Sequence, residues 1–327
     1  MPSTTHTLPS PDSLRQSPPE GIGPIAIMGL LLRHVFGPRT LMRRPEPQGV
    51  MNAAESVAEY NHVMESKLAI SYGIGWETIH RARSEGHTGL AVDFCSGPGV
   101  FSLGLAELLG YERVLGVDLA PAMVAAAKDN AQARGLGQRV DFTQADVTRR
   151  TVLPSGGADL CTLFDAAHHF DDMHAVKATT EEMERITHAQ GTLVLLDLAR
   201  LGSAELTERY VNTLGSDYRR LGLEHFLEDF RQSMYAAWTV DELREAVPAA
   251  SPRRWVQLVP RGLPALQMII GLPEGRKEPF VRGGIRPLVE SRIPATMHAD
   301  LRMLRLLLKL SPARVIQEPR GRKPLGR

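Results

Sequence analysis

Three acidic residues follow three short apolar runs, and their spacing indicates a site for a nucleoside. Asp93 lies near the end of the first run, Asp118 ends the second, and Asp146 follows the third. A carboxylate in the position of Asp118 can accept hydrogen bonds from both hydroxyls of a ribose. A carboxylate in the position of Asp146 can accept one from an adenine amino group. One such acid alone would more often cap a strand or face solvent. It is the presence of an acid at the end of each of three successive runs that indicates a ligand.

A glycine-containing turn stands between the first apolar run and the helical stretch after it. The segment reads Val-Asp-Phe-Cys-Ser-Gly-Pro-Gly and places glycines at 97 and 99. Glycine has no Cβ, so the chain can turn tightly and approach a ligand closely. Turns of this kind also bind dinucleotides, and a purely structural turn remains an alternative if the motif is taken alone.

Short apolar runs alternate with longer helical stretches from Gly89 onward. The expected strands are Leu90–Cys95, Val114–Asp118, Val140–Thr143, Ala158–Asp165 and Thr192–Asp197, and the expected helices are Val100–Leu109, Pro121–Arg134 and Met173–Thr187. This alternation produces right-handed crossovers and a parallel sheet. Continuous apolar strands fit a sheet that is covered on both faces. We therefore expect an α/β protein with a Rossmann-like, mostly parallel sheet and helices on both faces.

These motifs together resemble the class I S-adenosylmethionine-dependent methyltransferase family, over about Leu90 to Asp197. The resemblance implies S-adenosyl-L-methionine as the cofactor and methyl transfer as the reaction. By the same resemblance, the cofactor-binding residues are Asp93, Cys95, Gly97, Gly99, Asp118, Leu119, Asp146, Val147 and Asp165. The family pattern usually has a third glycine at or next to position 95. Cys95 replaces it here and leaves less room.

The loop after the fourth strand carries the candidate catalytic residues, His168 and His169. An unperturbed imidazole titrates near neutral pH, so either could act as a general base. Capping of the next helix, or packing under the loop, is the structural alternative. Ala166 and Ala167 stand where amino-methylating nucleic-acid enzymes have a Pro-Pro pair, and the loop looks more like that of small-molecule methyltransferases. We expect a small-molecule substrate.

A catalytic metal is not expected from the sequence. Aspartates and histidines of metal-ligand type gather on this loop. However, residues that are adjacent on one short loop rarely all face the same point, and methyl transfer usually proceeds without metal.

The remaining chain divides into segments that flank or interrupt the expected core. We expect a disordered N-terminus over 1–20, a helical N-terminal segment over 21–88 with a helix at Met51–Ile70, a core over 89–271 with a helical insertion at 203–235, and a basic C-terminal extension over 272–327 with a helix at Ala295–Leu310. Thr239 and Glu242 form a capping-box pattern. Trp255–Val259 and Leu266–Ile270 suit a closing hairpin. Aromatic residues in segments 51–75 and 203–235 are expected to cover the substrate.

Charge and cysteine content restrict the function classes. The formal net charge is +1, although 13 basic against 4 acidic residues give residues 275–327 a charge of +9 and the preceding 274 residues −8. The extension could hold an anionic partner, or it could pack on the acidic body. Nucleic acid is not an expected partner, and no segment is long and apolar enough to cross a bilayer. Two cysteines make no disulfide scaffold, and we expect a cytoplasmic protein.

Two other functions remain open at this point. The first is an NAD(P)-dependent oxidoreductase on the same fold, although Ser102 stands where the full Gly-x-Gly-x-x-Gly spacing needs its last glycine. The second is a protein that binds the cofactor or an anionic partner without transferring methyl groups. A homodimer formed through the N-terminal or C-terminal segments is a further expectation.

Overall fold

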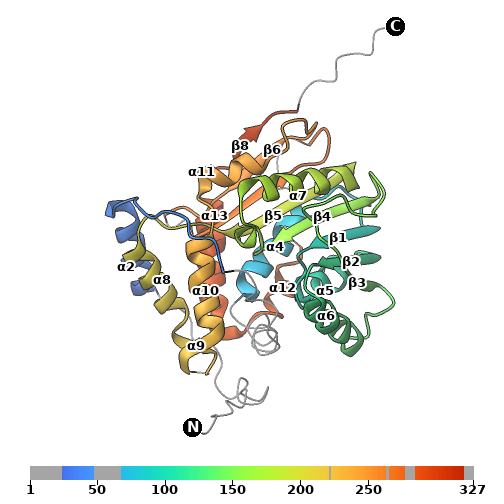
Figure 1. The fold of residues 1–327 in the computed structure, drawn as a ribbon. Helices are drawn as coiled ribbons and strands as arrows, with labels where there is room; N and C mark the ends of the chain where they lie inside the picture. Colours follow the sequence, from blue (N-terminus) through green and yellow to red (C-terminus); the bar gives the residue numbers. More distant parts are fainter. Residues whose placement is uncertain (1–23, 48–67, 221, 263–264, 277–283, 320–327) are drawn as a thin grey trace.

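The fold is taken from a computed structural model, shown in Figure 1. It describes residues 24–47, 68–220, 222–262, 265–276 and 284–319. The expected disorder of residues 1–20 and most of the expected helix Met51–Ile70 lie outside the described residues.

One eight-stranded sheet forms the centre of the molecule. Its strands are β1 Leu90–Phe94, β2 Arg113–Asp118, β3 Val140–Gln144, β4 Ala158–Phe164, β5 Thr187–Leu198, β6 Trp255–Leu258, β7 Leu266–Gly271 and β8 Arg314–Gln317. They lie in the order β3-β2-β1-β4-β5-β7-β6-β8. Strands β1 to β5 pair in parallel, whereas β7 is antiparallel to both β5 and β6. The expected α/β fold and the closing antiparallel pair are therefore confirmed.

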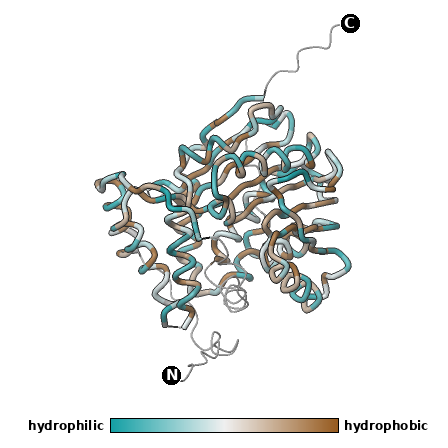
Figure 2. Tube along the Cα trace, in the orientation of Figure 1, coloured by the Kyte–Doolittle hydropathy of each residue, from teal (hydrophilic) through white to brown (hydrophobic). Residues whose placement is uncertain are grey.

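The central strands are apolar on both faces, because each face is covered by helices. Successive side chains of a strand point to opposite faces. Ala91 accordingly belongs to one buried cluster and Val92 to another. Figure 2 shows the apolar strands running through the middle of the molecule. This two-sided burial explains why the strands read as continuous apolar runs.

Different helices cover the two faces of the sheet. One cluster includes side chains of α4 Ala69–Ala82, α5 Val100–Glu107, α6 Pro121–Ala133, α12 Arg286–Glu290 and α13 His298–Lys309. The other cluster includes side chains of α7 Met173–Ile186 and α11 Val240–Leu243. The expected capping box of α11 is confirmed, since Thr239 accepts from the Glu242 backbone and Glu242 reaches back to Thr239.

A helical layer stands beside the carboxyl-terminal side of the sheet and has its own apolar cluster. It consists of α2 Pro24–Phe36, α8 Ala204–Leu214, α9 Ser216–Arg220 and α10 Glu224–Ala236. Leu30 of α2 packs with residues of α8 and α10, including Leu206 and Phe226. The insertion after β5 is therefore helical as expected. The sequence reasoning did not identify α2, α4 or β8 as separate elements.

The two cysteines form no disulfide with each other, as expected from their number. Cys161 is buried in β4, Cys95 is half-buried in the turn after β1, and both thiols are free. No helix in the described part of the chain is long and apolar enough to span a membrane.

The basic C-terminal extension is packed against the body in its described part. Arg305 of α13 forms ion pairs with the buried carboxylate of Glu77 on α4 and with Glu290 on α12. Arg81 also approaches Glu77, at 3.7 Å. The structure therefore uses part of this positive charge internally. That agrees with the expectation that the extension packs on the acidic body.

We predict that Arg305→Met lowers the free energy of unfolding by about 2–4 kcal/mol, because it leaves the Glu77 carboxylate buried with less compensation. Chemical denaturation measures this change. The double variant Glu77→Leu/Arg305→Met is the control and should regain much of the loss, since it removes both charges together. Equal destabilisation by the single and double variants would contradict a buried ion pair.

Candidate functional site

A cavity of about 860 Å³ opens at the carboxyl-terminal edge of the parallel strands. Its volume lies within the usual range for small-molecule and cofactor sites. It is lined by Cys95, Ser96 and Gly97 after β1, by Asp118 and Leu119 at the end of β2, by Asp146 and Val147 after β3, and by Asp165 and His169 after β4. The predicted residues from four separate strand ends therefore meet at one place, as expected for an open α/β sheet.

The glycine turn is held by the second strand. Gly97 has φ 51°, and its backbone N–H donates to Asp118 Oδ2 over 2.8 Å. Gly99 has φ 81°, and a Cβ at this position would lie 2.5 Å from the ring of Phe142. The backbone conformation favours glycine at both positions, and close packing against Phe142 makes glycine necessary at Gly99.

Asp118 and Asp146 differ in how many of their carboxylate lone pairs already accept hydrogen bonds within the protein. Asp118 is half-buried and accepts one backbone N–H on each oxygen, from Gly97 and Ala120. Burial raises its pKa, although these hydrogen bonds act in the opposite direction. Asp146 accepts from the backbone and hydroxyl of Thr148 and pairs with Arg149. Each carboxylate oxygen has two lone pairs, so Asp118 retains acceptors that face the cavity.

Two of the predicted cofactor residues, Asp93 and Gly99, do not line the cavity. Asp93 is fully buried, and it accepts hydrogen bonds from Ser102 and Thr162 over 2.5 and 2.6 Å. Burial raises its pKa to about 6. Asp93 lies beneath the turn and links β1 to the following helix and to β4, whereas Gly99 ends the turn and packs against Phe142. Their effect on a ligand is therefore indirect.

Asp165 lies at the junction of two cavities. It lines the large cavity and also a small one of about 40 Å³ beneath α10. Its Oδ2 accepts from Ser71 over 3.3 Å, whereas its buried Oδ1 has no hydrogen-bond partner among the described residues. Burial raises its pKa to about 7, with a contribution from nearby Asp197. A buried acceptor without a partner at this position is suited to a ligand that donates a hydrogen bond.

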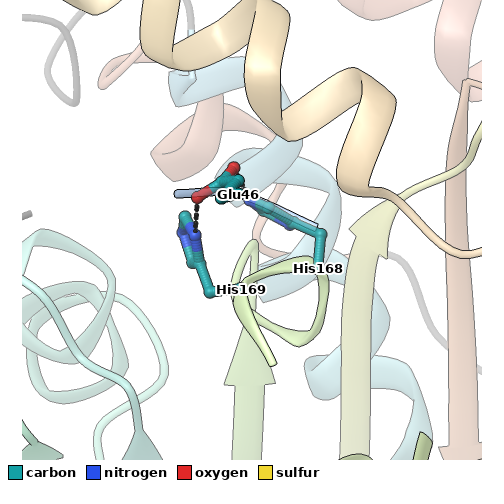
Figure 3. A group of neighbouring side chains, drawn as sticks. All are labelled: Glu46, His168 and His169. Atoms are coloured by element: carbon teal, nitrogen blue, oxygen red, sulfur yellow. Dashed lines mark hydrogen bonds and ion pairs between the residues drawn. The ribbon is translucent and has the colours of Figure 1, made fainter. Parts of the chain in front are cut away.

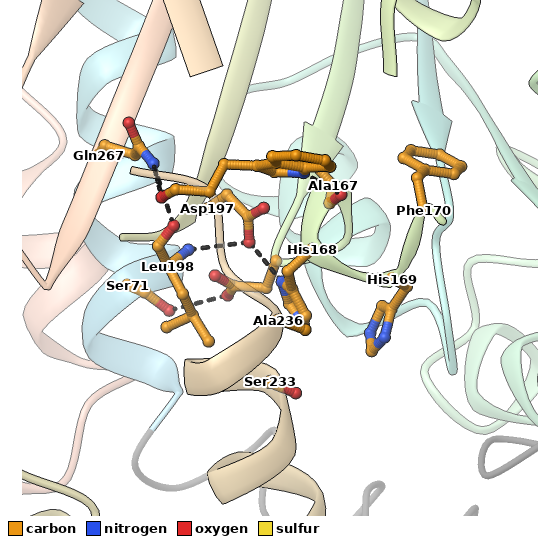
Figure 4. A network of polar contacts seen from close by, with 12 residues as sticks. Ser71, Ala167, His168, His169, Phe170, Asp197, Leu198, Ser233, Ala236 and Gln267 are labelled. Atoms are coloured by element: carbon orange, nitrogen blue, oxygen red, sulfur yellow. Dashed lines mark hydrogen bonds and ion pairs between the residues drawn. The ribbon is translucent and has the colours of Figure 1, made fainter. Parts of the chain in front are cut away.

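His168 is oriented by a buried carboxylate at the end of β5. Its Nδ1 lies 2.5 Å from Asp197 Oδ1, and both side chains are almost fully buried. Figure 4 shows this contact within a network that also includes Leu198 and Gln267. Burial acts to lower the pKa of His168, but Asp197 outweighs it and the pKa is raised to about 9.

His169 meets a carboxylate from the N-terminal segment. Its Nδ1 lies 2.5 Å from Glu46 Oε2, while Glu46 Oε1 accepts from Ser233 on α10 over 2.7 Å. Burial acts to raise the pKa of Glu46, but the contacts with both histidines and Ser233 lower it to about 2. The small cavity is lined by all three of these residues and by Asp165 and His168.

Sequence reasoning missed Glu46 and the arginine that holds it in place. The guanidinium of Arg43 donates to the backbone oxygens of His168, Phe170, Asp171 and Ala236, and it lies 3.8 Å from the ring centre of Trp238. Trp238 Nε1 in turn donates to Ala167. The only local sequence signal is the Pro-Glu-Pro around Glu46. It predicts an extended segment, because a residue before proline avoids the helical region.

A family model described as "Methyltransferase domain" matches residues 91–191. These residues include the glycine turn, the three strand-end acids and both histidines. This part of the chain, about a third of the whole, therefore matches a methyltransferase domain. The family implies S-adenosylmethionine as its cofactor.

Individual relatives are similar to this chain in sequence or in fold. Demethylmenaquinone methyltransferase from Thermus thermophilus is 33% identical over 106 residues, which are 32% of this chain and 46% of that protein. The chain thus matches about half the length of that curated relative. A solved methyltransferase from Aquifex aeolicus is 14% identical, covers 67% of this chain and 98% of its own, and has a TM-score of 0.42. A proposed methyltransferase from Methanococcus maripaludis is 17% identical, covers 72% and 99%, and has a TM-score of 0.46.

The methyltransferase domain has donors and acceptors suited to S-adenosylmethionine in its large cavity. The Gly97 turn leaves room on one side, the acceptors of Asp118 face the cavity, and Asp165 Oδ1 lacks a partner in the described structure. Carboxylates close to a ligand also favour a positive group such as a sulfonium. The residues present therefore fit this cofactor.

We predict that Asp93→Asn removes a pH dependence of stability. The folded pKa of Asp93 is about 6, whereas an unfolded aspartate titrates near 3.9. Wild type should therefore lose stability as pH rises from about 4 to about 6, because only the unfolded carboxyl ionises readily there. The difference between variant and wild type should change by about 3 kcal/mol over this interval. Denaturation at several pH values tests this, and a constant difference would contradict it.

Proposed function

We propose that this protein transfers the methyl group of S-adenosylmethionine to a small molecule bound beneath α10. The proposal depends on one arrangement: the large cavity meets the small one at Asp165, Glu46 and His169. The Gly97 turn and Asp118 would hold a cofactor in the cavity that reaches this junction. The bound cofactor supplies a methyl group on a positively charged sulfur leaving group.

The insertion and the N-terminal segment provide the substrate side of this arrangement. Phe226 and Phe230 of α10 line the small cavity together with Leu68 and Leu198. Apolar walls around a few polar groups are typical of small-molecule sites and exclude water. The expected covering role of segment 203–235 is therefore supported, while much of segment 51–75 lies outside the described residues.

We assign the proton acceptor role to Asp165 and positioning roles to His168 and His169. Both imidazoles already contact carboxylates, Asp197 and Glu46 respectively, whereas Asp165 Oδ1 has no partner in the described part of the chain. In the proposed reaction, Asp165 would accept the proton of a hydroxyl or amine nucleophile, whose oxygen or nitrogen would take the methyl group that the cofactor supplies. The sulfur leaving group would keep the electron pair of its bond to that methyl group. Holding these atoms in line is the main contribution of the protein.

We predict that Asp118→Ala weakens the binding of S-adenosylhomocysteine at least tenfold, because two charge-assisted hydrogen bonds to the ribose are lost. Isothermal titration calorimetry measures the affinity. Asp118→Asn, which keeps an acceptor for one of the two backbone N–H groups, serves as a check on folding. Asp241→Ala removes an exposed acid on α11 and is the matched control. Unchanged affinity in Asp118→Ala would rule out the proposed ribose contact.

Incubation of the protein with a cell extract and isotopically labelled S-adenosylmethionine tests the activity itself. We expect one labelled small molecule in the mass spectrum, absent when Asp165→Asn replaces the wild type. The oxidoreductase alternative predicts instead that NAD, rather than S-adenosylhomocysteine, raises the melting temperature. Cofactor binding without any labelled product would favour a non-catalytic protein.

A further inference from the structure

Three side chains of metal-ligand type converge between the two cavities. Glu46, His168 and His169 each offer a ligand atom, and these atoms lie within 4.8 Å of one another. Figure 3 shows both imidazoles turned toward the Glu46 carboxylate. The short helical turn Ala167–His169 places the two rings on the same side, with their centres 4.1 Å apart. The sequence-based reason for expecting no metal, that adjacent residues rarely face one point, therefore does not hold here.

His168 directs its Nε2 at this point. Its Nδ1 lies 2.5 Å from the buried Asp197, so that nitrogen donates its proton to the carboxylate. Nε2 faces Glu46 Oε1 at 4.0 Å, and a bound metal ion would replace the proton that this nitrogen carries in the charged ring. Metal-binding histidines characteristically donate their other N–H to a carboxylate in this way.

The distance between His168 and Glu46 fits a shared ion better than a shared proton. A separation of 4.0 Å is too long for a hydrogen bond. Two ligand atoms that each lie about 2.1 Å from one ion are separated by roughly 3–4 Å. His169 Nδ1 and Glu46 Oε2 are closer, at 2.5 Å, so an ion between them would move these side chains apart by roughly 1 Å.

We propose that Glu46, His168 and His169 bind one divalent transition-metal ion, of which Zn²⁺ is the representative. Two imidazoles with one carboxylate favour such ions over Mg²⁺ or Ca²⁺, which prefer oxygen ligands alone. Three protein ligands leave a coordination position for an oxygen of the substrate. This last role rests on the proposed function and implies a substrate that carries a hydroxyl or carbonyl oxygen beside the methylated atom.

A second group of the same composition lies at the opposite edge of the sheet and differs in one decisive respect. His87 and His188 both contact Asp159 Oδ1, over 3.1 and 2.6 Å. His188 Nδ1 accepts the backbone N–H of Gln190, so its proton lies on Nε2 and is directed at Asp159. No lone pair of His188 is thus available to an ion, and this group provides a built-in control.

Titration of the metal-stripped, full-length protein with Co²⁺ tests the proposal, because the visible absorption of Co²⁺ reports its ligands without any methyl transfer. Calorimetry with Zn²⁺ gives the affinity. We expect one ion per chain, and at least a tenfold loss of affinity in Glu46→Gln and in His169→Gln. His188→Gln should bind the ion as wild type does.

Melting curves and calorimetry with S-adenosylhomocysteine distinguish a loss of metal binding from misfolding and from a loss of cofactor binding. The half-buried Glu46 and His169 are chosen because their variants disturb the core less than a change at His168. Normal melting and cofactor binding with lost metal binding would support the proposal. Stoichiometric binding that survives both variants, binding lost only in His188→Gln, or no stoichiometric binding would overturn it. A failed cofactor titration would instead count against the proposed function.

Discussion

The site depends on carboxylates that are buried at one edge of a parallel sheet. Removing a carboxylate from water is costly unless hydrogen bonds or a positive group compensate. Asp197 meets part of this cost at Oδ1, through His168 and the Leu198 backbone, and it thereby fixes the orientation of that ring. Asp165 has only Ser71 as a described hydrogen-bond partner. The edge is consequently electronegative at the place where a cationic cofactor would reduce the cost.

A second constraint comes from a segment far away in sequence. Arg43 fastens the loop after β4 by donating to three of its backbone oxygens while its guanidinium stacks on Trp238. The same extended segment delivers Glu46 to His169. The candidate catalytic loop is therefore positioned from three sides: by β5 through Asp197, by Trp238, and by the N-terminal segment. Such support is what holds reacting groups within the small tolerances of catalysis.

The sheet and most of the cofactor cavity could be predicted from the sequence, because both follow from local patterns. Apolar runs of strand length mark β1 to β5, and the acid that follows a strand must lie at its carboxyl edge, as Asp118 does. The indirect role of Asp93 could not be predicted, since its direction depends on Ser102 and Thr162 across the fold. Glu46 could not be predicted either, because more than 100 residues separate it from His169.

Backbone strain in the described structure is concentrated at the same edge. Cys95 has φ 54° and Asp165 has φ 46°, and they are the non-glycine residues with positive φ in the described part of the chain. Such conformations cost roughly 1–3 kcal/mol each and persist only where the surroundings enforce them. Cys95 stands where the family usually has glycine, so the turn has kept its shape with a residue less suited to it. Both residues line the cofactor cavity. Asp165, with its positive φ, lies at the junction of the two cavities, which is where the proposed reaction needs an acceptor.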